Sequence, residues 1–94
     1  MASYAVTTIT TSGDLNTHIE LFLIDATNGS INCHLPTITT DGNSYFFKRT
    51  DSNILSTVTL TADKGNTINN NATHNITLND GIRIVSYDTN YIIL

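Results

Sequence analysis

The 94-residue sequence predicts an all-β fold, an antiparallel β-sandwich or jelly-roll-like domain of eight or nine short strands. Three observations favour this fold. Apolar and polar residues alternate with a period of two in most segments, turn-forming residues separate these segments, and no segment repeats its apolar residues every 3.6 positions. Short strands at such close spacing are typical of sandwiches, jelly rolls and barrel-like folds.

Alternation in the first half of the chain is clearest in "SINCHL", where Ile31 and Cys33 fall on one face and Asn32 and His34 on the other. The segment "HIELFLID" is apolar on both faces, which is typical of a central or an interface strand. In the second half, "TVTLTA" and "IRIVSY" alternate in the same way. The expected strands are 3–11, 18–25, 30–35, 44–50, 56–62, 66–69, 75–79, 82–87 and 90–94.

Turn signals lie between these strands. Asn28-Gly29 joins "FLID" to "SINCHL", and Asp80-Gly81 joins "NITL" to "IRIV". Both dipeptides favour type I′ turns, so they predict two β-hairpins. Pro36 ends a strand at a place where its missing N–H costs little.

The last strand, "YIIL", is apolar on both faces. Alternation places Tyr91 and Ile93 on one side and Ile92 and Leu94 on the other. A strand of this kind lies between two layers, or between a core and a partner subunit. We therefore expect the end of the chain to be buried.

Composition limits the organisation and the partners of the chain. Its length predicts a single domain over residues 1–94, and a core of this size is modest. Cys33 is the one cysteine, so an intrachain disulfide is excluded and oligomerisation remains as a source of stability. The net charge of −4 without a basic run argues against nucleic acid, and no apolar run reaches the roughly 20 residues needed for membrane insertion.

Candidate chemical groups have simple structural explanations. The histidines His18, His34 and His74 lie in separate segments without metal-ligand spacing, so neither a metal nor another cofactor is expected. A histidine repeated around a three-fold axis is the less favoured alternative. Cys33 reads as a small buried hydrophobe. The carboxylates occupy turn contexts, so we expect no enzyme activity; they are Asp41, Asp51, Asp63, Asp80 and Asp88.

Threonine-rich stretches such as "TTITT" and "TVTLT" resemble the arrays of ice-binding solenoids. Those arrays repeat at a fixed period, and this sequence has no internal repeat. Solvent-facing strand positions explain the threonines better.

One loop has the composition of a ligand site. Tyr87, Asp88 and Asn90 bring an aromatic ring and two hydrogen-bonding groups together near the end of the chain. A tyrosine at a loop edge can stack on a sugar ring, and loops carry binding residues on rigid β scaffolds. These three residues are the predicted ligand-binding residues.

Nearly the whole chain resembles one β-rich domain of viral fibres. The segments "IDATNGSINCHLP", "GNSYFFKRTDSNILSTVTLTADKGNTI" and "ITLNDGIRIVSYDTNYIIL" are similar to a domain of phage tail fibres and of fibre or collagen-like proteins of giant viruses. The shared features are a strand ending in Leu-Pro, a Gly-x-x-Tyr strand with basic residues followed by Asp, a Val-Thr-Leu strand, a Gly-x-Thr-Ile turn and the terminal strand. Two places depart from this pattern: Tyr91 stands without a preceding Trp, and Asn69–Asn71 replace a glycine.

The resemblance implies a homotrimeric head, or knob, of a fibre on the virion surface. Such a domain would attach to a receptor on the host surface, of which a glycan is the favoured kind, through shallow sites repeated in each subunit. The alternative is a structural trimerisation module that caps a fibre shaft and binds no ligand. A glycan-degrading spike would need a pair of carboxylates in a groove, and no motif supports one.

Overall fold

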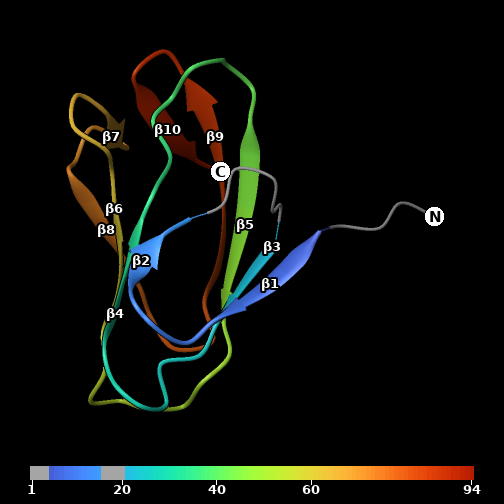
Figure 1. Ribbon diagram of the computed structural model, residues 1–94, viewed down its shortest axis with the longest axis vertical. Coiled ribbons are helices and arrows are strands. Elements are labelled where there is room, and N and C mark those ends of the chain that lie inside the picture. Colours follow the sequence, from blue (N-terminus) through green and yellow to red (C-terminus); the bar gives the residue numbers. More distant parts are fainter. Residues whose placement is uncertain (1–4, 16–20) are drawn as a thin grey trace.

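The computed structural model describes residues 5–15 and 21–94. These residues form ten strands and no helix, which confirms the all-β prediction (Figure 1). The strands are β1 (Val6–Ile9), β2 (Gly13–Asp14), β3 (Leu21–Ile24), β4 (Ile31–His34), β5 (Ser44–Arg49), β6 (Val58–Thr61), β7 (Thr67–Ile68), β8 (Thr73–Ile76), β9 (Gly81–Tyr87) and β10 (Asn90–Ile93).

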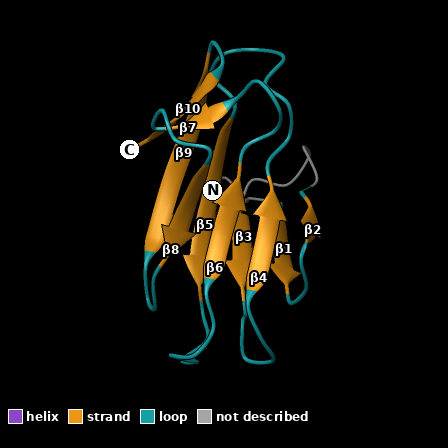
Figure 2. Cartoon of the chain, turned by 90° about the vertical axis from the view of Figure 1, so that its left-hand side faces the viewer, coloured by secondary structure: helices purple, strands orange, loops and turns teal. Residues whose placement is uncertain are grey.

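The strands build two sheets that face each other. A six-stranded sheet has the order β1-β3-β5-β9-β10-β7, and a four-stranded sheet has the order β2-β4-β6-β8. Figure 2 shows the two layers from the side, with β4 and β6 running in one direction and β3 and β5 in the other. Neighbours within each set are parallel: β1 with β3, β3 with β5, β2 with β4, and β4 with β6.

The first six strands therefore form a β-solenoid of stacked coils, and the prediction of an antiparallel sandwich or jelly roll is wrong. The chain passes from one sheet to the other at each of these turns, so β3, β4, β5 and β6 each lie beside the strand one coil earlier. The coils differ in length. Leu21 lies 15 positions after its partner Val6, whereas Phe46 lies 25 positions after Leu21. Coils of unequal length leave no fixed period, which is why no repeat is visible in the sequence.

Both predicted hairpins are also wrong, because their turns join different sheets. The turn at Asn28-Gly29 carries the chain from β3 to β4, and the link at Asp80-Gly81 carries it from β8 to β9. The Gly29 N–H donates to the carbonyl of Ala26 at 3.2 Å. The antiparallel pairs are β5 with β9, β6 with β8, and β9 with β10. Among these, only β9 and β10 follow each other directly in the described chain.

The core lies between the sheets and follows the alternation seen in the sequence. In β3, Phe22 and Ile24 point inward with 1% and 0% of their surface exposed. The Phe22 and Phe47 rings stack with centroids 5.2 Å apart, and Tyr45 meets Tyr91 edge-on at 6.2 Å. The strands of the four-stranded sheet, with Leu35 directly after β4, contribute further inward side chains, namely Ile31, Cys33, Leu35, Val58, Leu60 and Ile76.

The end of the chain is buried on one face. Strand β10 lies between β9 and β7, and Tyr91 is 1% exposed while Ile93 packs against the core. The Tyr91 hydroxyl donates to the carbonyl oxygen of Pro36 at 2.6 Å. Burial is the main cause that raises the pKa of Tyr91. On the other face, Leu94 is 69% exposed. Within one chain, the expected burial of β10 therefore holds for the face turned toward the core and does not hold for Leu94.

Candidate functional site

The predicted ligand-binding residues lie among the loops that join the strands on one side of the two sheets. We call this side of the molecule the Asp88 end. It comprises the loops 35–43, 62–66, 69–72 and 88–89, at the top of Figure 1. Tyr87 ends β9 and is 64% exposed. In the β9–β10 pairing, Asn90 stands directly opposite Tyr87, with Asp88 in the turn between them. The structure thus brings the three residues together, although each has a different environment.

Asp88 forms the β9–β10 turn with a left-handed backbone, at φ +57°. Aspartate and asparagine tolerate this conformation better than most side chains. The Asp88 N–H donates to the Asp41 carboxylate at 2.8 Å. Asp41 therefore anchors the turn from a loop 47 positions earlier.

Asn90 is half-buried and holds the fold together. Its side-chain oxygen accepts hydrogen bonds from the Thr67 hydroxyl at 2.9 Å and from the Asn70 N–H at 3.0 Å. These bonds tie β10 to β7 and to the tight turn that follows β7. The amide oxygen that the sequence offered as a ligand contact is thus engaged within the protein.

The loop before β5 is fixed against β9 through Ser86. The buried Ser86 hydroxyl donates to the Thr40 carbonyl at 2.8 Å and accepts from the Asn43 N–H at 3.0 Å. The Gly42 N–H donates to the Ser86 carbonyl at 2.8 Å, and Gly42 has φ +87°, a conformation that glycine adopts without strain. The loops at the Asp88 end are therefore held in place before any ligand arrives.

The chemistry available at the Asp88 end suits shallow binding. One face of an exposed tyrosine can pack on the apolar side of a sugar, and the nearby carboxylates of Asp41 and Asp88 can accept hydrogen bonds from hydroxyl groups. Both aspartates are exposed. A surface of this kind can bind a polar ligand weakly.

A second polar group lies beside the four-stranded sheet, between β4 and the loop after β6. The His34 Nε2 lies 2.9 Å from the Asp63 Oδ1, and the Thr37 hydroxyl donates to the other Asp63 oxygen. The bond from Thr37, followed by that from His34, lowers the pKa of Asp63. A cavity of about 270 Å³ adjoins this group and is also lined by Asp14, Leu15, Leu35 and Pro36.

This second group does not resemble a nucleophilic site. In a nucleophile–histidine–carboxylate arrangement the imidazole bonds to the nucleophile, whereas here the Asp63 carboxylate stands between the histidine and the hydroxyl. Cys33 is no better placed, because it is buried and its burial raises the pKa of the thiol to about 11. A thiol of this kind is unreactive near neutral pH.

The strongest polar cluster of the described residues is one that sequence reasoning missed. Arg49 and Asp51 lie at the opposite end of the solenoid and form an ion pair, with Nε to Oδ1 and Nη2 to Oδ2 both at 3.0 Å. Their side chains are 3% and 0% exposed. The turn interpretation of Asp51 is incomplete, because its carboxylate also receives the Ala26 N–H at 3.0 Å.

Arg49 and Asp51 together connect three loops at this end, which we call the Arg49 end: residues 25–30, 50–57 and 77–80. Asp51 accepts the Ala26 N–H of the first loop, and the Arg49 backbone N–H donates to the Asp80 carbonyl of the third. The Arg49 guanidinium donates to the carbonyls of Ile76, Asn53 and Ser56 at 3.2, 3.0 and 3.0 Å. The bond from Arg49 is the main cause that lowers the pKa of Asp51 well below its ordinary value. The alternation along β5 could have predicted the burial of Arg49, since Arg49 falls on the same strand face as the buried Tyr45 and Phe47.

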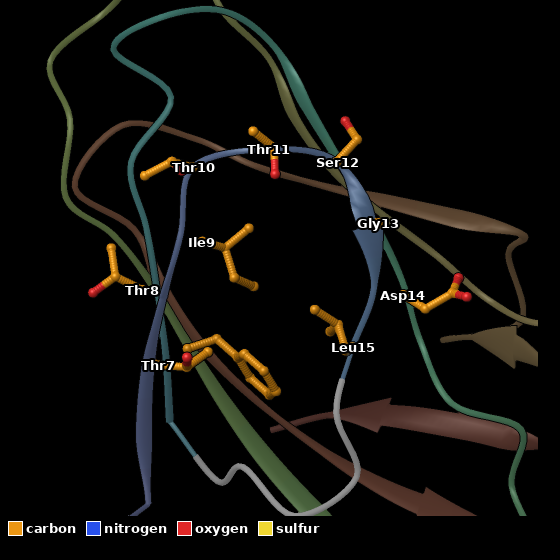
Figure 3. Close-up of a pocket in the computed structure, with 10 residues that line it drawn as sticks. Thr7, Thr8, Ile9, Thr10, Thr11, Ser12, Gly13, Asp14 and Leu15 are labelled. Carbon is orange, nitrogen blue, oxygen red and sulfur yellow. The ribbon is translucent and has the colours of Figure 1, made fainter.

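A further pocket opens where β1 meets β2. It measures about 370 Å³, and Figure 3 shows Ile9 and Leu15 turned toward its interior while Thr8 and Asp14 point away. The lining is a chain of small polar residues around a few apolar ones. Residues 16–20, which follow Leu15, lie outside the described residues.

The other candidates from the sequence stay separate. His18 lies outside the described residues, and His74 is half-buried on the edge strand β8. Within residues 5–15 and 21–94, no group of three or more His, Cys, Asp or Glu side chains is placed to hold a metal ion. The same residues include no helix with the length and apolar character to cross a bilayer. Comparison of the sequence with protein-family models and with curated proteins finds no match.

Proposed function

We propose that this chain is the head domain of a viral or phage fibre, a homotrimer on the virion surface that attaches to a host-surface glycan. The observation that carries the proposal is the exposed Tyr87 ring on an immobilised loop cluster. A rigid, shallow surface binds one sugar weakly, and three copies on one head would raise the overall affinity through avidity.

The resemblance to fibre domains supports the same proposal, and the structure adds a reason of its own. The loops at the Asp88 end come from distant parts of the chain, yet the hydrogen bonds that Asp41 accepts and those that Ser86 accepts and donates hold them together. Loops fixed in this way lose little freedom on binding, so a small contact area can suffice. We propose no catalytic role, because the carboxylates are explained by turns and by the Arg49 pair.

An array of immobilised host glycans tests the proposal. Tyr87→Ala removes the ring and should reduce glycan binding by about tenfold or more, because stacked aromatic anchors dominate such contacts. The matched control is Leu55→Ala, which removes an 89%-exposed side chain at the Arg49 end and should leave binding unchanged. If the wild-type chain binds a glycan and folded Tyr87→Ala binds it equally well, the site assignment is wrong.

The second candidate is a structural trimerisation module without a ligand. It is favoured by the apolar outer face of the six-stranded sheet, where Val6 is 51% and Leu94 is 69% exposed. A module of this kind should form a trimer and bind none of the glycans on the array. Failure of the wild-type chain to bind any host glycan, together with a stable trimer, would favour it over the attachment function.

A further inference from the structure

A polar cavity lies on the outer face of the four-stranded sheet, at its rim toward the Asp88 end. It measures about 270 Å³, and we call it the His34 pocket. The parallel register of β2 and β4 places Asp14 directly beside His34. Cys33, the neighbour of His34 along β4, is buried in the core, so His34 and Asp14 lie on the outer face.

Two loops complete the walls of the His34 pocket. Thr37 follows β4, and Asp63 follows β6. The Asp63 carboxylate accepts the Thr37 hydroxyl and lies 2.9 Å from the His34 Nε2. The Asn66 N–H donates to the Asp63 carbonyl at 2.9 Å, and the Ile38 N–H donates to the Asn66 side-chain oxygen at 3.0 Å. The polar groups of the pocket are therefore held in place by the fold.

The free polar atoms of this pocket are hydrogen-bond acceptors. The Asp14 carboxylate is exposed and has no hydrogen-bond or ion-pair partner among residues 5–15 and 21–94. An ionised Asp63 carboxylate only accepts, so the neutral His34 ring carries its proton on Nε2 and leaves Nδ1 as an acceptor. No lysine or arginine is among the described residues that line the pocket.

These acceptors select the charge of a ligand. Two carboxylates in one pocket favour a group that donates hydrogen bonds and carries positive charge, and they disfavour an anion. A metal ion fits poorly, because no three His, Cys, Asp or Glu side chains in the described part of the chain are placed to hold one. The complementary group is therefore an ammonium group, with hydroxyl groups as further donors.

Size and apolar lining narrow the class of ligand further. Leu15 and Pro36 line the same cavity, and both are partly exposed. Pockets for small molecules measure roughly 300–1,000 Å³, so this cavity suits one small ring rather than an extended molecule. A sugar ring presents hydroxyl groups and apolar C–H groups together, and it can use both kinds of lining.

We propose that the His34 pocket binds a single sugar ring that carries an amino group. The Asp14 carboxylate pairs with the ammonium group, and Asp63 and His34 accept hydrogen bonds from ring hydroxyls. Leu15 and Pro36 contact the C–H groups of the ring. This contact is separate from the Tyr87 ring, and it does not depend on the attachment function.

A titration with three single sugars, followed by two-dimensional NMR near neutral pH, tests the ligand class. Glucosamine should bind about fivefold more tightly than glucose, the upper scale of an exposed ion pair. Glucuronic acid, which carries a carboxylate, should bind more weakly than glucose. The backbone amide signals of His34, Thr37 and Asp63 should shift during the titration with glucosamine.

Removal of one charge tests the role of Asp14. Asp14→Asn keeps the size of the side chain and should weaken glucosamine binding by about fivefold, while glucose binding stays within about twofold. The control is Asp25→Asn, an equal charge change at the Arg49 end, which keeps the oxygen that accepts the Thr27 N–H and should leave both affinities unchanged. Circular dichroism shows that each variant is folded.

Four results would overturn the inference. They are equal binding of glucose and glucosamine, tightest binding of glucuronic acid, equal binding of ethanolamine (an ammonium group without a ring), and no binding of any of these sugars by the wild-type chain. Shifts confined to amides outside the His34 pocket would also overturn it. The glycan array with Tyr87→Ala tests the attachment function at a different contact, so either idea can fail without the other.

Discussion

The two ends of the solenoid use the same residue type in opposite surroundings. At the Arg49 end, Asp51 is buried and its carboxylate bonds to Arg49 and to the Ala26 N–H. At the Asp88 end, Asp41 and Asp88 are exposed, and the Asp41 carboxylate accepts a single backbone N–H of the neighbouring turn. Asp51 and Asp41 both fix loops, but of these two only the buried Asp51 has its charge balanced by a cation inside the protein.

This difference shows how burial determines the contribution of a carboxylate to the stability of the fold. Water screens an exposed carboxylate, so its loss changes stability little. A buried ion pair is different, because removing one partner leaves the other charge without compensation in a medium of low polarity. At the Arg49 end the pair also satisfies three carbonyl groups, and no buried side-chain polar atom of the described residues lacks a partner.

The same substitution at the two ends gives the largest expected contrast. Asp51→Asn removes the charge that balances Arg49 and should lower the free energy of unfolding by about 3–5 kcal/mol. Asp88→Asn keeps a residue that tolerates the left-handed turn and should change it by less than about 0.5 kcal/mol. Urea unfolding followed by circular dichroism measures both. Equal effects of the two substitutions would mean that the burial of Asp51 has no energetic consequence.

Acid should remove the contribution of the Asp51 carboxylate to stability. The folded pKa of Asp51 lies below its ordinary value of 3.8, so its contribution to stability is present above the unfolded-state value and is lost as pH falls through the folded one. The urea midpoint of the wild-type chain should therefore decrease progressively below about pH 5. Asp51→Asn should have a lower midpoint at neutral pH and a flatter acid limb. An acid limb of the same steepness in both proteins would assign the effect to other carboxylates.

A smaller effect is expected at the Asp88 end. Asn90→Ala removes the acceptor for Thr67 and Asn70 and should cost about 1–2 kcal/mol, the usual scale for two partly exposed hydrogen bonds. Hydrogen exchange should show faster opening of β7 than of β3. Thr67→Val, which removes one of the two bonds, serves as the intermediate case. If Asn90→Ala is as stable as the wild-type chain, the side chain is available to a ligand rather than committed to the fold.

The positions of most strands and the inward face of each followed from the sequence. The expected segments overlap every strand except β2, which is two residues long and lies just beyond the expected strand 3–11. The burial of Cys33 and of Tyr91 was also predicted correctly, because alternation alone decides which side chains point to the core. Of the predicted site, Tyr87 is exposed as a binding residue would be, and Asn90 serves the β7 turn.

The features that followed from the amino-acid sequence are local: an all-β chain, the alternation of inner and outer side chains, and the places where the chain turns. Which strands pair depended on the tertiary structure. A turn such as Asn28-Gly29 can close a hairpin or carry the chain to a second sheet, and alternation is the same in parallel and antiparallel neighbours. The burial of the Arg49–Asp51 ion pair also depended on the tertiary structure. Charged side chains can be buried here because segments distant in sequence close around them and supply hydrogen-bond partners.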